Sequence, residues 1–447
     1  MPAVHPFRAV QFQQGKGDLS AVIAPPYDVL SKTQRDALVA KDPRNIVALD
    51  LPHTPAKELG PPEAYARAGD SYRAMLKSGT LARRDKPAIF AYRQTFDFVG
   101  KRFERCGMAC CTEALAFGPR PGGGILPHEE TFSGPKEDRL ALMKATRSQL
   151  SPIFGIIADE AGTATKLVRG IMQTQPPTAT GNMGDGITHE VWTIEDPEII
   201  RNYQKALAAQ DIFIADGHHR YNTALNYLKT LEAAGPVAAD HPARRIMMVL
   251  VGMSDPGLAI GPTHRVLGGM KDYTFDAFKL AAAGLLDITP SGGDLSKIES
   301  AMAAAARATT RSVLGLYDFK TRQCYTCTPT ADDPLAAMFP AKPKPWRLLD
   351  VALAQYLIVE RICQPKLNAG NPVKWAFPHS VGEVAEIGSG LETGSGGGTG
   401  FAQLAVIVRP TPLDAVRDIS RANELMPQKS TFFYPKLATG LFVNPLD

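Results

Sequence analysis

The stretch IFIADGHHRYNTAL at residues 212–225 decides the fold. An apolar run typical of a strand ends at Asp216-Gly217, and a helix is predicted to begin directly after it. A helix that opens behind a strand presents free backbone N–H groups and the positive end of its dipole, an arrangement that binds phosphate oxygens. Gly217 lets the backbone approach such a ligand closely. The segment therefore predicts a phosphate site in an α/β environment.

Polar side chains at this turn add to the predicted phosphate site. His218, His219 and Arg220 supply further donors, and a guanidinium can hold two oxygens at once. Asp216 can hold Mg²⁺ or orient a histidine. The alternative is an aspartate that only caps the helix beside exposed histidines. Four chemically capable residues at one strand end favour the functional interpretation.

Outward from this turn, strands and helices alternate along the 447 residues, which predicts an α/β or mixed α+β chain with more than one core. Predicted strands are 45–51, 88–98, 107–117, 151–158, 189–194, 246–253 and 401–408, with a hairpin at 313–328. Predicted helices are 31–40, capped by Ser31, 135–148, 197–209, 219–233, 346–362 and 412–421, with two more within 273–310. Residues 159–187 are predicted to be an irregular excursion and 388–400 a flexible glycine-rich loop.

Composition narrows the class of protein. The net charge is only +4 and no long Lys/Arg block occurs, so neither nucleic acid nor a membrane surface is expected as a partner. The start lacks the apolar region of a secretory signal, and apolar runs such as IMMVLVGM at 246–253 are too short to span a bilayer. A cytoplasmic location is therefore predicted.

Cys324 and Cys327 have the spacing of zinc ligands, but no second ligand pair flanks them. Their segment, RQCYTCTPT, is typical of an exposed strand. We interpret both as ordinary strand residues.

A second candidate site begins at Pro127 with the sequence PHEE. A carboxylate beside a histidine can serve as a general base, so His128 and Glu129 are candidates. The alternative is a capping cluster, including Glu130, for the helix predicted near residue 135.

A third candidate lies near the C-terminus, in MPQKSTFFYPK at residues 426–436. Lys429, Ser430 and Thr431 stand side by side and can bind a phosphate or a carboxylate. The alternative is an ordinary surface loop. The segment Thr263-His264-Arg265 is a weaker candidate.

Five ordered motifs reveal a family resemblance. They are IAPPYDVL at 23–30, LPHEET at 126–131, SPIF at 151–154, ADGHHRYNTAL at 215–225 and MPQKSTFFYPKLATGL at 426–441. Together they resemble a large prokaryotic family known only as the domain of unknown function numbered one thousand and fifteen, and the match extends over essentially the whole chain.

From about residue 104 onward, the order of motifs also resembles the archaeal ADP-dependent free-serine kinases of the ParB/sulfiredoxin-like superfamily. Their PHE, DGHHR and SPKTT motifs correspond to residues 127–129, 216–220 and 427–431. The first hundred residues have no counterpart in those kinases. The pattern of residues 1–103 predicts an added N-terminal α/β unit. The resemblance implies a ParB/sulfiredoxin-like nucleotide-binding core at 104–270 with an insert at 158–210, and an α/β region at 271–447 that completes the site.

The resemblance also implies residue roles. Glu129, with His128 beside it, would act as the base on a substrate hydroxyl. The segment from Asp216 to Arg220 would bind the phosphate chain and its metal, Mg²⁺, through Asp216. Lys429, Ser430 and Thr431 would line the same site.

The implied activity is that of a phosphotransferase. It would move a phosphoryl group from ADP, ATP or pyrophosphate to the hydroxyl of a small metabolite, with free L-serine favoured. Two alternatives stay open: a phosphatase of a small phosphorylated metabolite, and a non-catalytic, nucleotide-gated ParB-like binding protein. The oligomeric state is left open.

Overall fold

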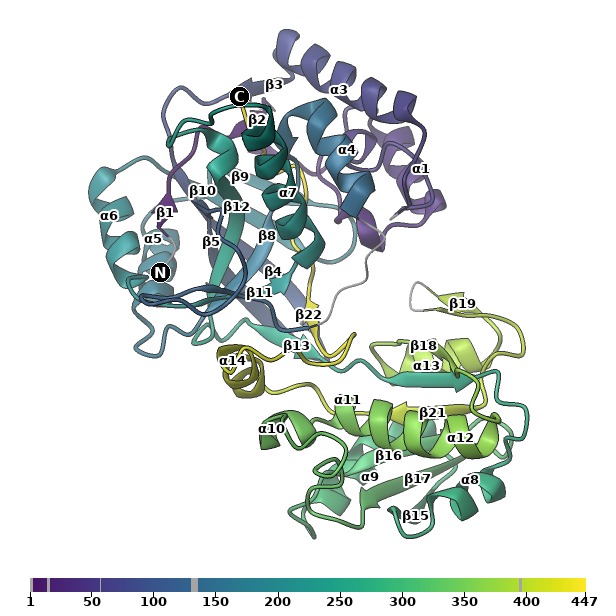
Figure 1. Ribbon diagram of the computed structural model, residues 1–447. Helices are drawn as coiled ribbons and strands as arrows, with labels where there is room; N and C mark the ends of the chain where they lie inside the picture. Colours follow the sequence, from purple (N-terminus) through teal and green to yellow (C-terminus); the bar gives the residue numbers. More distant parts are fainter. Residues whose placement is uncertain (1–2, 14–16, 57, 130–135, 394–395) are drawn as a thin grey trace. The chain divides into compact units, whose positions relative to one another are not determined.

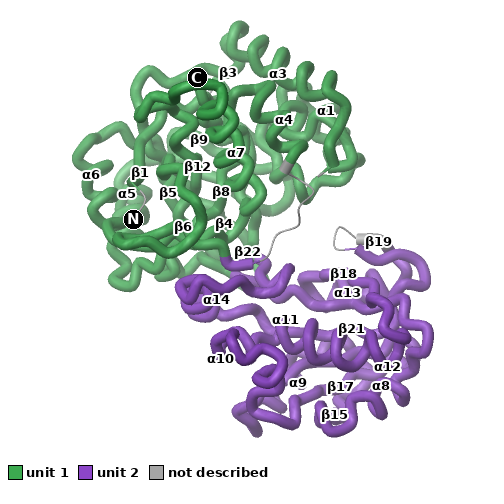
Figure 2. The backbone as a smooth tube through the Cα atoms, viewed as in Figure 1, with its two compact units in different colours: residues 1–127, 131–259, 433–447 green, residues 128–130, 260–432 purple. Residues whose placement is uncertain are grey.

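The computed structural model describes residues 3–13, 17–56, 58–129, 136–393 and 396–447 (Figure 1). The chain forms two compact units (Figure 2). Unit 1 comprises residues 1–127, 131–259 and 433–447, and unit 2 comprises residues 128–130 and 260–432. The three predicted segments divide the chain differently, and their first boundary, between 103 and 104, falls inside strand β5 (Lys101–Glu113).

Unit 1 is built on a nine-stranded mixed sheet in the order β6-β11-β8-β12-β5-β4-β10-β9, with β1 paired to β5. Strand β11 runs parallel to β6 and antiparallel to β8, and β12 runs parallel to β8. The strands are β1 (Val4–His5), β4 (Ile89–Phe98), β5, β6 (Ile125–Leu126), β8 (Ile153–Ile157), β9 (Ala179–Asn182), β10 (Thr188–Ile194), β11 (Ile212–Asp216) and β12 (Arg245–Gly252). Two short pairs are β2 (Val10–Phe12) with β3 (Leu81–Arg83) and β7 (Ser148–Gln149) with β23 (Asn444–Pro445).

The helices of unit 1 are α1 (Lys32–Lys41), α2 (Val47–Asp50), α3 (Pro62–Lys77), α4 (Lys136–Thr146), α5 (Thr163–Thr174), α6 (Pro197–Ala206) and α7 (His218–Ala234). Val168 of α5, Tyr203 of α6 and Tyr221 of α7 belong to one buried cluster with strand residues of the sheet. The C-terminal segment also packs against the sheet, where Phe442 stacks on Phe90 with ring centroids 5.6 Å apart. Burial of this apolar area is the main stabilising contribution to unit 1.

Unit 2 is built on a six-stranded sheet in the order β15-β17-β16-β21-β14-β18. Its strands are β14 (Arg265–Gly268), β15 (Leu286–Gly292), β16 (Leu314–Asp318), β17 (Gln323–Pro329), β18 (Lys374–Ala376) and β21 (Leu404–Ile407). Its helices are α8 (Phe275–Ala282), α9 (Ile298–Ala306), α10 (Lys344–Arg347), α11 (Asp350–Ala352), a π-helix (Leu353–Cys363), α12 (Gln364–Leu367), α13 (Val381–Gly388) and α14 (Leu413–Arg421). Short strands β13 (Ala259–Gly261) and β22 (Phe432–Tyr434) lie where the chain passes between units.

The mixed α+β class predicted from the sequence is confirmed, as are most of its elements. Ser31 caps α1 through a capping box, accepting from the Gln34 N–H while the Gln34 side chain accepts from the Ser31 N–H. The hairpin predicted at 313–328 is β16–β17. Within the described residues, no helix has the length and apolar character needed to cross a membrane.

Two predictions in unit 1 are wrong. Residues 45–51, predicted as a strand, contain the short helix α2, because Asn45 starts it by accepting from the Val47 N–H while donating to the carbonyls of Ala21 and Ile23. Residues 159–187, predicted to be irregular, contain α5 and β9, and the Asp159 side chain accepts from backbone N–H groups in the first turn of α5.

Further corrections concern unit 2. The single helix predicted at 346–362 is broken into α10, α11 and a π-helix, and strand β15 lies between the two helices predicted within 273–310. The predicted loop at 388–400 contains the short strands β19 (Glu392–Thr393) and β20 (Gly396–Gly397), while residues 394–395 lie outside the described residues. Cys324 and Cys327, predicted to be on an exposed strand, are both buried in β17.

Candidate functional site

The turn from β11 to α7 has the predicted strand-to-helix geometry. Ile212 and Ile214 are fully buried, and the register of β11 shifts by a bulge before Asp216, which ends the strand. Gly217 caps α7 with a φ of +95°. A Cβ atom there would lie 3.1 Å from Nε of Arg220, so glycine is needed both for the backbone conformation and for space.

Asp216 is the centre of an ion-pair cluster in unit 1. Its Oδ2 accepts from Nη2 of Arg220, and its Oδ1 accepts from Nζ of Lys436 at 2.5 Å. Arg220 also donates from Nη1 to the carbonyl of Pro152. The three side chains are partly buried, with 17% of Asp216, 11% of Arg220 and 24% of Lys436 exposed. Two cations are thus held together at the N-terminal end of a helix.

The charge balance fixes the protonation state of Asp216. Burial alone would raise the pKa of this carboxyl group, but the positive charges of Lys436 and Arg220 outweigh burial and hold the pKa well below its usual value. Burial likewise opposes the charge of Arg220, yet Asp216 and neighbouring acidic groups raise the pKa of the guanidinium. At neutral pH the cluster is therefore one carboxylate between two cations.

Lys436 was not selected from the sequence, although it ends the predicted 426–436 segment. Its backbone is fixed by β4 and β5: Gln94 donates to the carbonyl of Lys436 at 2.9 Å, and Arg105 donates to the carbonyl of Tyr434 at 3.1 Å. Arg105 is 2% exposed and lies over the ring of Phe154 at 4.5 Å. Because the burial of Arg105 is a property of the fold, no local pattern in the sequence indicated the position of Lys436.

The predicted histidines occupy the first turn of α7. His218 is 7% exposed, and its carbonyl accepts from the Asn222 side chain. The carbonyl of His219 accepts from the hydroxyl of Thr223 at 2.8 Å. The positive charge of His218, when it is protonated, adds to the charges that lower the pKa of Asp216.

A second cluster of predicted residues lies in unit 2. His128 and Glu129 run beside the segment at 426–431: the Met426 N–H donates to the carbonyl of His128 at 2.9 Å, and the Ser430 N–H donates to Oε2 of Glu129 at 3.1 Å. Nε2 of His128 lies 2.7 Å from Oγ1 of Thr431. His128 is 1% exposed, whereas 22% of the Glu129 side chain is exposed. Glu130 lies outside the described residues.

Buried polar groups support this second cluster. Arg265, 1% exposed, donates to the carbonyl of Lys429 at 3.1 Å, and Thr411 donates to the carbonyl of Ser430 at 2.7 Å. Burial lowers the pKa of Arg265 to about 10, while the charge of Glu129 acts to raise it. Lys429 has a φ of +59° and an exposed side chain. Arg265, a weaker candidate from the sequence, thus fixes the backbone of the 428–429 segment.

The predicted residues therefore fall into two clusters. Asp216, Gly217, His218, His219 and Arg220 lie in unit 1, where Lys436 joins them. The remaining predicted residues lie in unit 2, namely His128, Glu129, Lys429, Ser430 and Thr431.

The residues around Asp216 do not fit a resident metal ion. Each of its carboxylate oxygens already accepts from a cation, so Mg²⁺ bound there would meet the charges of Arg220 and Lys436. Across the part of the chain that the structure describes, no three His, Cys, Asp or Glu side chains are grouped as metal ligands. Cys324 and Cys327 are three residues apart on one strand, so their side chains point to opposite faces of the sheet and cannot share a zinc ion.

Three solved structures match this chain at low sequence identity and low TM-score. A free serine kinase in complex with AMP is 10% identical with a TM-score of 0.33, and the match covers 71% of this chain and 88% of that one. SbnI with a C-terminal truncation, from Staphylococcus aureus, is 9% identical with a TM-score of 0.33, covering 76% and 87%. A conserved hypothetical protein from Pyrococcus furiosus is 12% identical with a TM-score of 0.30, covering 70% and 89%.

Comparison with the curated proteins gives no match. Among protein families, the one described as "Protein of unknown function (DUF1015)" matches residues 4–352, most of the chain. The family resemblance inferred from the five sequence motifs is thereby confirmed. The chain belongs to the DUF1015 family.

Proposed function

We propose that this protein is a phosphotransferase that moves a phosphoryl group from a nucleotide or pyrophosphate to the hydroxyl of a small metabolite, with free L-serine the favoured acceptor. One observation carries the proposal: Arg220 and Lys436 are both held by Asp216 at the N-terminal end of α7. Two cations fixed at the N-terminal end of a helix, where the helix dipole is positive, match the charge of a phosphate chain.

Asp216 acts in this proposal as a positioning residue. Its pKa lies far below neutrality, so it is a poor base at physiological pH. Its two oxygens instead hold the guanidinium of Arg220 and the ammonium of Lys436 in place before a ligand arrives. Such preorganised charges stabilise the transition state of phosphoryl transfer without reorganising during the reaction.

Glu129 is the proposed general base. Ser430 donates to Oε2, which holds the carboxylate in one orientation, and part of the side chain stays exposed. In the proposed step the acceptor hydroxyl loses its proton to Glu129 as its oxygen forms a bond to phosphorus. The bond between phosphorus and the leaving oxygen breaks, and the leaving group departs with that electron pair. A Mg²⁺ ion carried on the donor phosphates stays a prediction, and no step here depends on it.

The test is phosphorus-31 NMR of the protein incubated with ADP, ATP or pyrophosphate and pooled amino acids and polyols. We expect a new phosphomonoester signal that requires both donor and acceptor. Lys436→Met and Glu129→Gln should lose it, while the exposed controls Lys77→Met and Glu160→Gln should keep it. Free phosphate released from added phosphoserine, with no transfer from any donor, would indicate a phosphatase of a small phosphorylated metabolite instead. Donor binding without turnover would indicate a nucleotide-gated binding protein.

A further inference from the structure

Unit 1 contains a small cavity whose lining includes Arg220 and residues from the N-terminal part of the chain. Its polar lining includes Tyr27, Asp50, Arg139, Ser151 and Arg220, together with Ser148, Gln149 and Thr223. The rest of its wall is largely apolar and includes Ala224 of α7. None of these residues except Arg220 has a role in the proposed phosphate site.

Arg139 is held in one orientation beside this cavity. Its Nε donates to Oδ2 of Asp138 at 2.6 Å, its Nη1 donates to the carbonyl of Asp50 at 2.6 Å, and its guanidinium lies 3.9 Å from the ring centroid of Tyr27. Asp138 in turn accepts from Tyr65 at 2.7 Å and lies 2.8 Å from Nε2 of His53. The guanidinium therefore has little freedom to turn towards another acceptor.

One donor of this guanidinium is unused. Arg139 is 6% exposed, yet its Nη2 forms no hydrogen bond with any residue that the structure describes. Neighbouring acidic groups raise the pKa of Arg139 despite its burial, so its charge is retained. A buried, charged donor without an acceptor is unfavourable, and a ligand oxygen at Nη2 would relieve it.

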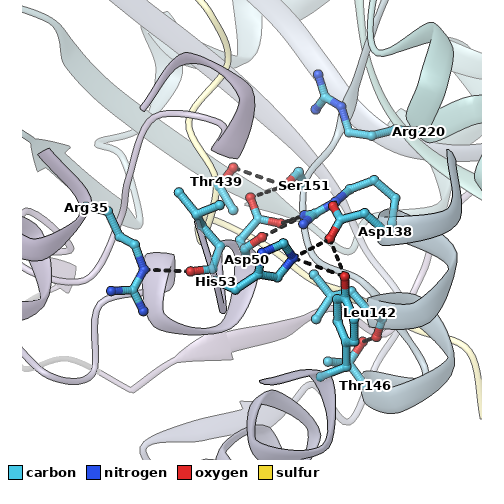
Figure 3. A network of polar contacts seen from close by, with 12 residues as sticks. Arg35, Asp50, His53, Asp138, Leu142, Thr146, Ser151, Arg220 and Thr439 are labelled. Atoms are coloured by element: carbon cyan, nitrogen blue, oxygen red, sulfur yellow. Dashed lines mark hydrogen bonds and ion pairs between the residues drawn. The ribbon is translucent and has the colours of Figure 1, made fainter. Parts of the chain in front are cut away.

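Asp50 sets the kind of anion that fits. Its Oδ2 accepts from Ser151 at 2.9 Å, and Ser151 itself accepts from Thr439 at 3.2 Å (Figure 3). Its Oδ1 accepts from Nη1 of Arg139 at 3.4 Å, and a carboxylate oxygen can accept from a second donor as well. Burial raises the pKa of Asp50, while the charge of Arg139 and the hydrogen bond from Ser151 act to lower it. When Asp50 is ionised, it repels a doubly charged phosphate, whereas a carboxylate that carries a donor on its α-carbon satisfies both Arg139 and Asp50.

We propose that this cavity binds the carboxylate end of a small α-hydroxy or α-amino acid, with the ligand carboxylate on Nη2 of Arg139 and its α-donor on Oδ1 of Asp50. Because Arg220 also borders the cavity, such a ligand would lie next to a residue of the phosphate site. The identification of this ligand as the phosphoryl acceptor rests on the proposed function. The carboxylate site itself does not.

The test is calorimetric titration with four probes: L-serine, glycerate, serinol, which lacks the carboxylate, and 3-hydroxypropanoate, which lacks the α-donor. We expect L-serine or glycerate to bind wild-type protein, with serinol and 3-hydroxypropanoate at least about tenfold weaker. Arg139→Met should weaken the bound probe by about 10- to 100-fold. The exposed control Arg67→Met should leave its affinity unchanged.

Arg139 also supports the fold, so two further variants keep the test decisive. Arg139→Lys retains a positive charge beside Asp138 but lacks Nη2, and Ala224→Leu fills the cavity without altering any charge. Both should lose the bound probe while melting cooperatively. The proposal is overturned if neither L-serine nor glycerate binds, if serinol binds as well as they do, or if both variants bind like wild type.

Titration with pyrophosphate on the same preparations separates this inference from the proposed function. If pyrophosphate binds and its binding needs Lys436, but neither L-serine nor glycerate binds, the proposed cavity site is refuted and the proposed phosphate site is supported. If L-serine or glycerate binds and its binding needs Arg139, but no phosphate donor binds, the proposed phosphotransferase activity is refuted and the carboxylate site is supported.

Discussion

Replacing Lys436 by Met removes one of the two cations on Asp216 while keeping the length of the side chain. Asp216 retains its ion pair with Arg220, and 24% of the Lys436 side chain is exposed. We therefore expect a modest loss of folding free energy, about 1–2 kcal/mol. That is less than the ~3–5 kcal/mol typical when a buried charge loses its only partner.

Phosphate binding should suffer more than stability. One charge-assisted hydrogen bond contributes about 1.5–3 kcal/mol, which corresponds to an affinity about 10- to 150-fold weaker for pyrophosphate or ADP. Calorimetric titration at fixed ionic strength measures this directly, and thermal melting on the same preparation measures the stability change. Lys77→Met, an exposed lysine at the end of α3, is the matched control.

The reasoning would be refuted by a folded Lys436→Met protein whose pyrophosphate affinity is within threefold of wild type. It would also be refuted if the Lys77 control lost affinity to the same degree, since the effect would then be general charge screening.

Four further outcomes are expected. Glu129→Gln should lower kcat by about 10²- to 10⁴-fold with donor affinity and melting temperature unchanged, because glutamine can still accept from Ser430 but cannot take a proton. Steady-state kinetics measure this, and near-normal turnover would remove Glu129 as the base. Asp216→Asn should be less stable than wild type at pH 7. The difference in stability between the two proteins should shrink as pH falls below about 4, because a carboxylate whose pKa is low in the folded protein contributes stability above its pKa in the unfolded chain and loses that contribution in acid. Thermal melts at several pH values measure this, and a stability difference that does not change with pH would contradict it. Calorimetric titration of the protein with MgCl₂ in the absence of nucleotide should give no binding heat, because both carboxylate oxygens of Asp216 already accept from cations. Binding of Mg²⁺ with micromolar affinity would contradict this. Cys324→Ala with Cys327→Ala should retain activity and release no zinc, and a loss of metal measured by elemental analysis would restore the zinc interpretation.

The strand-to-helix turn could be predicted because its signals are local. An apolar run, Gly217 and a helical pattern lie within a few residues of one another, and each has a direct backbone consequence. Ser31 with Gln34 could be predicted for the same reason. The strand predicted at 45–51 was wrong because Asn45 takes its partners more than twenty residues away, at Ala21 and Ile23.

The full ion-pair cluster could not be predicted in this way. Lys436 reaches Asp216 across 220 positions of the sequence, and its backbone is fixed by Gln94 and Arg105 from yet another part of the chain. Arg139 of α4 is held by the carbonyl of Asp50 and the ring of Tyr27, both far from it in the sequence. These contacts join residues that are far apart in the sequence, so the local pattern of apolar and polar residues does not predict them.

The central claim is that donor phosphates bind where β11 meets α7. The most direct measurement is an experimental structure of the protein soaked with ADP or pyrophosphate. We predict a phosphate oxygen within about 3.2 Å of Nζ of Lys436 and of a backbone N–H in the first turn of α7, with Arg220 still paired to Asp216. A donor bound elsewhere on the protein, with the Asp216 cluster unchanged and empty of phosphate, would contradict the account.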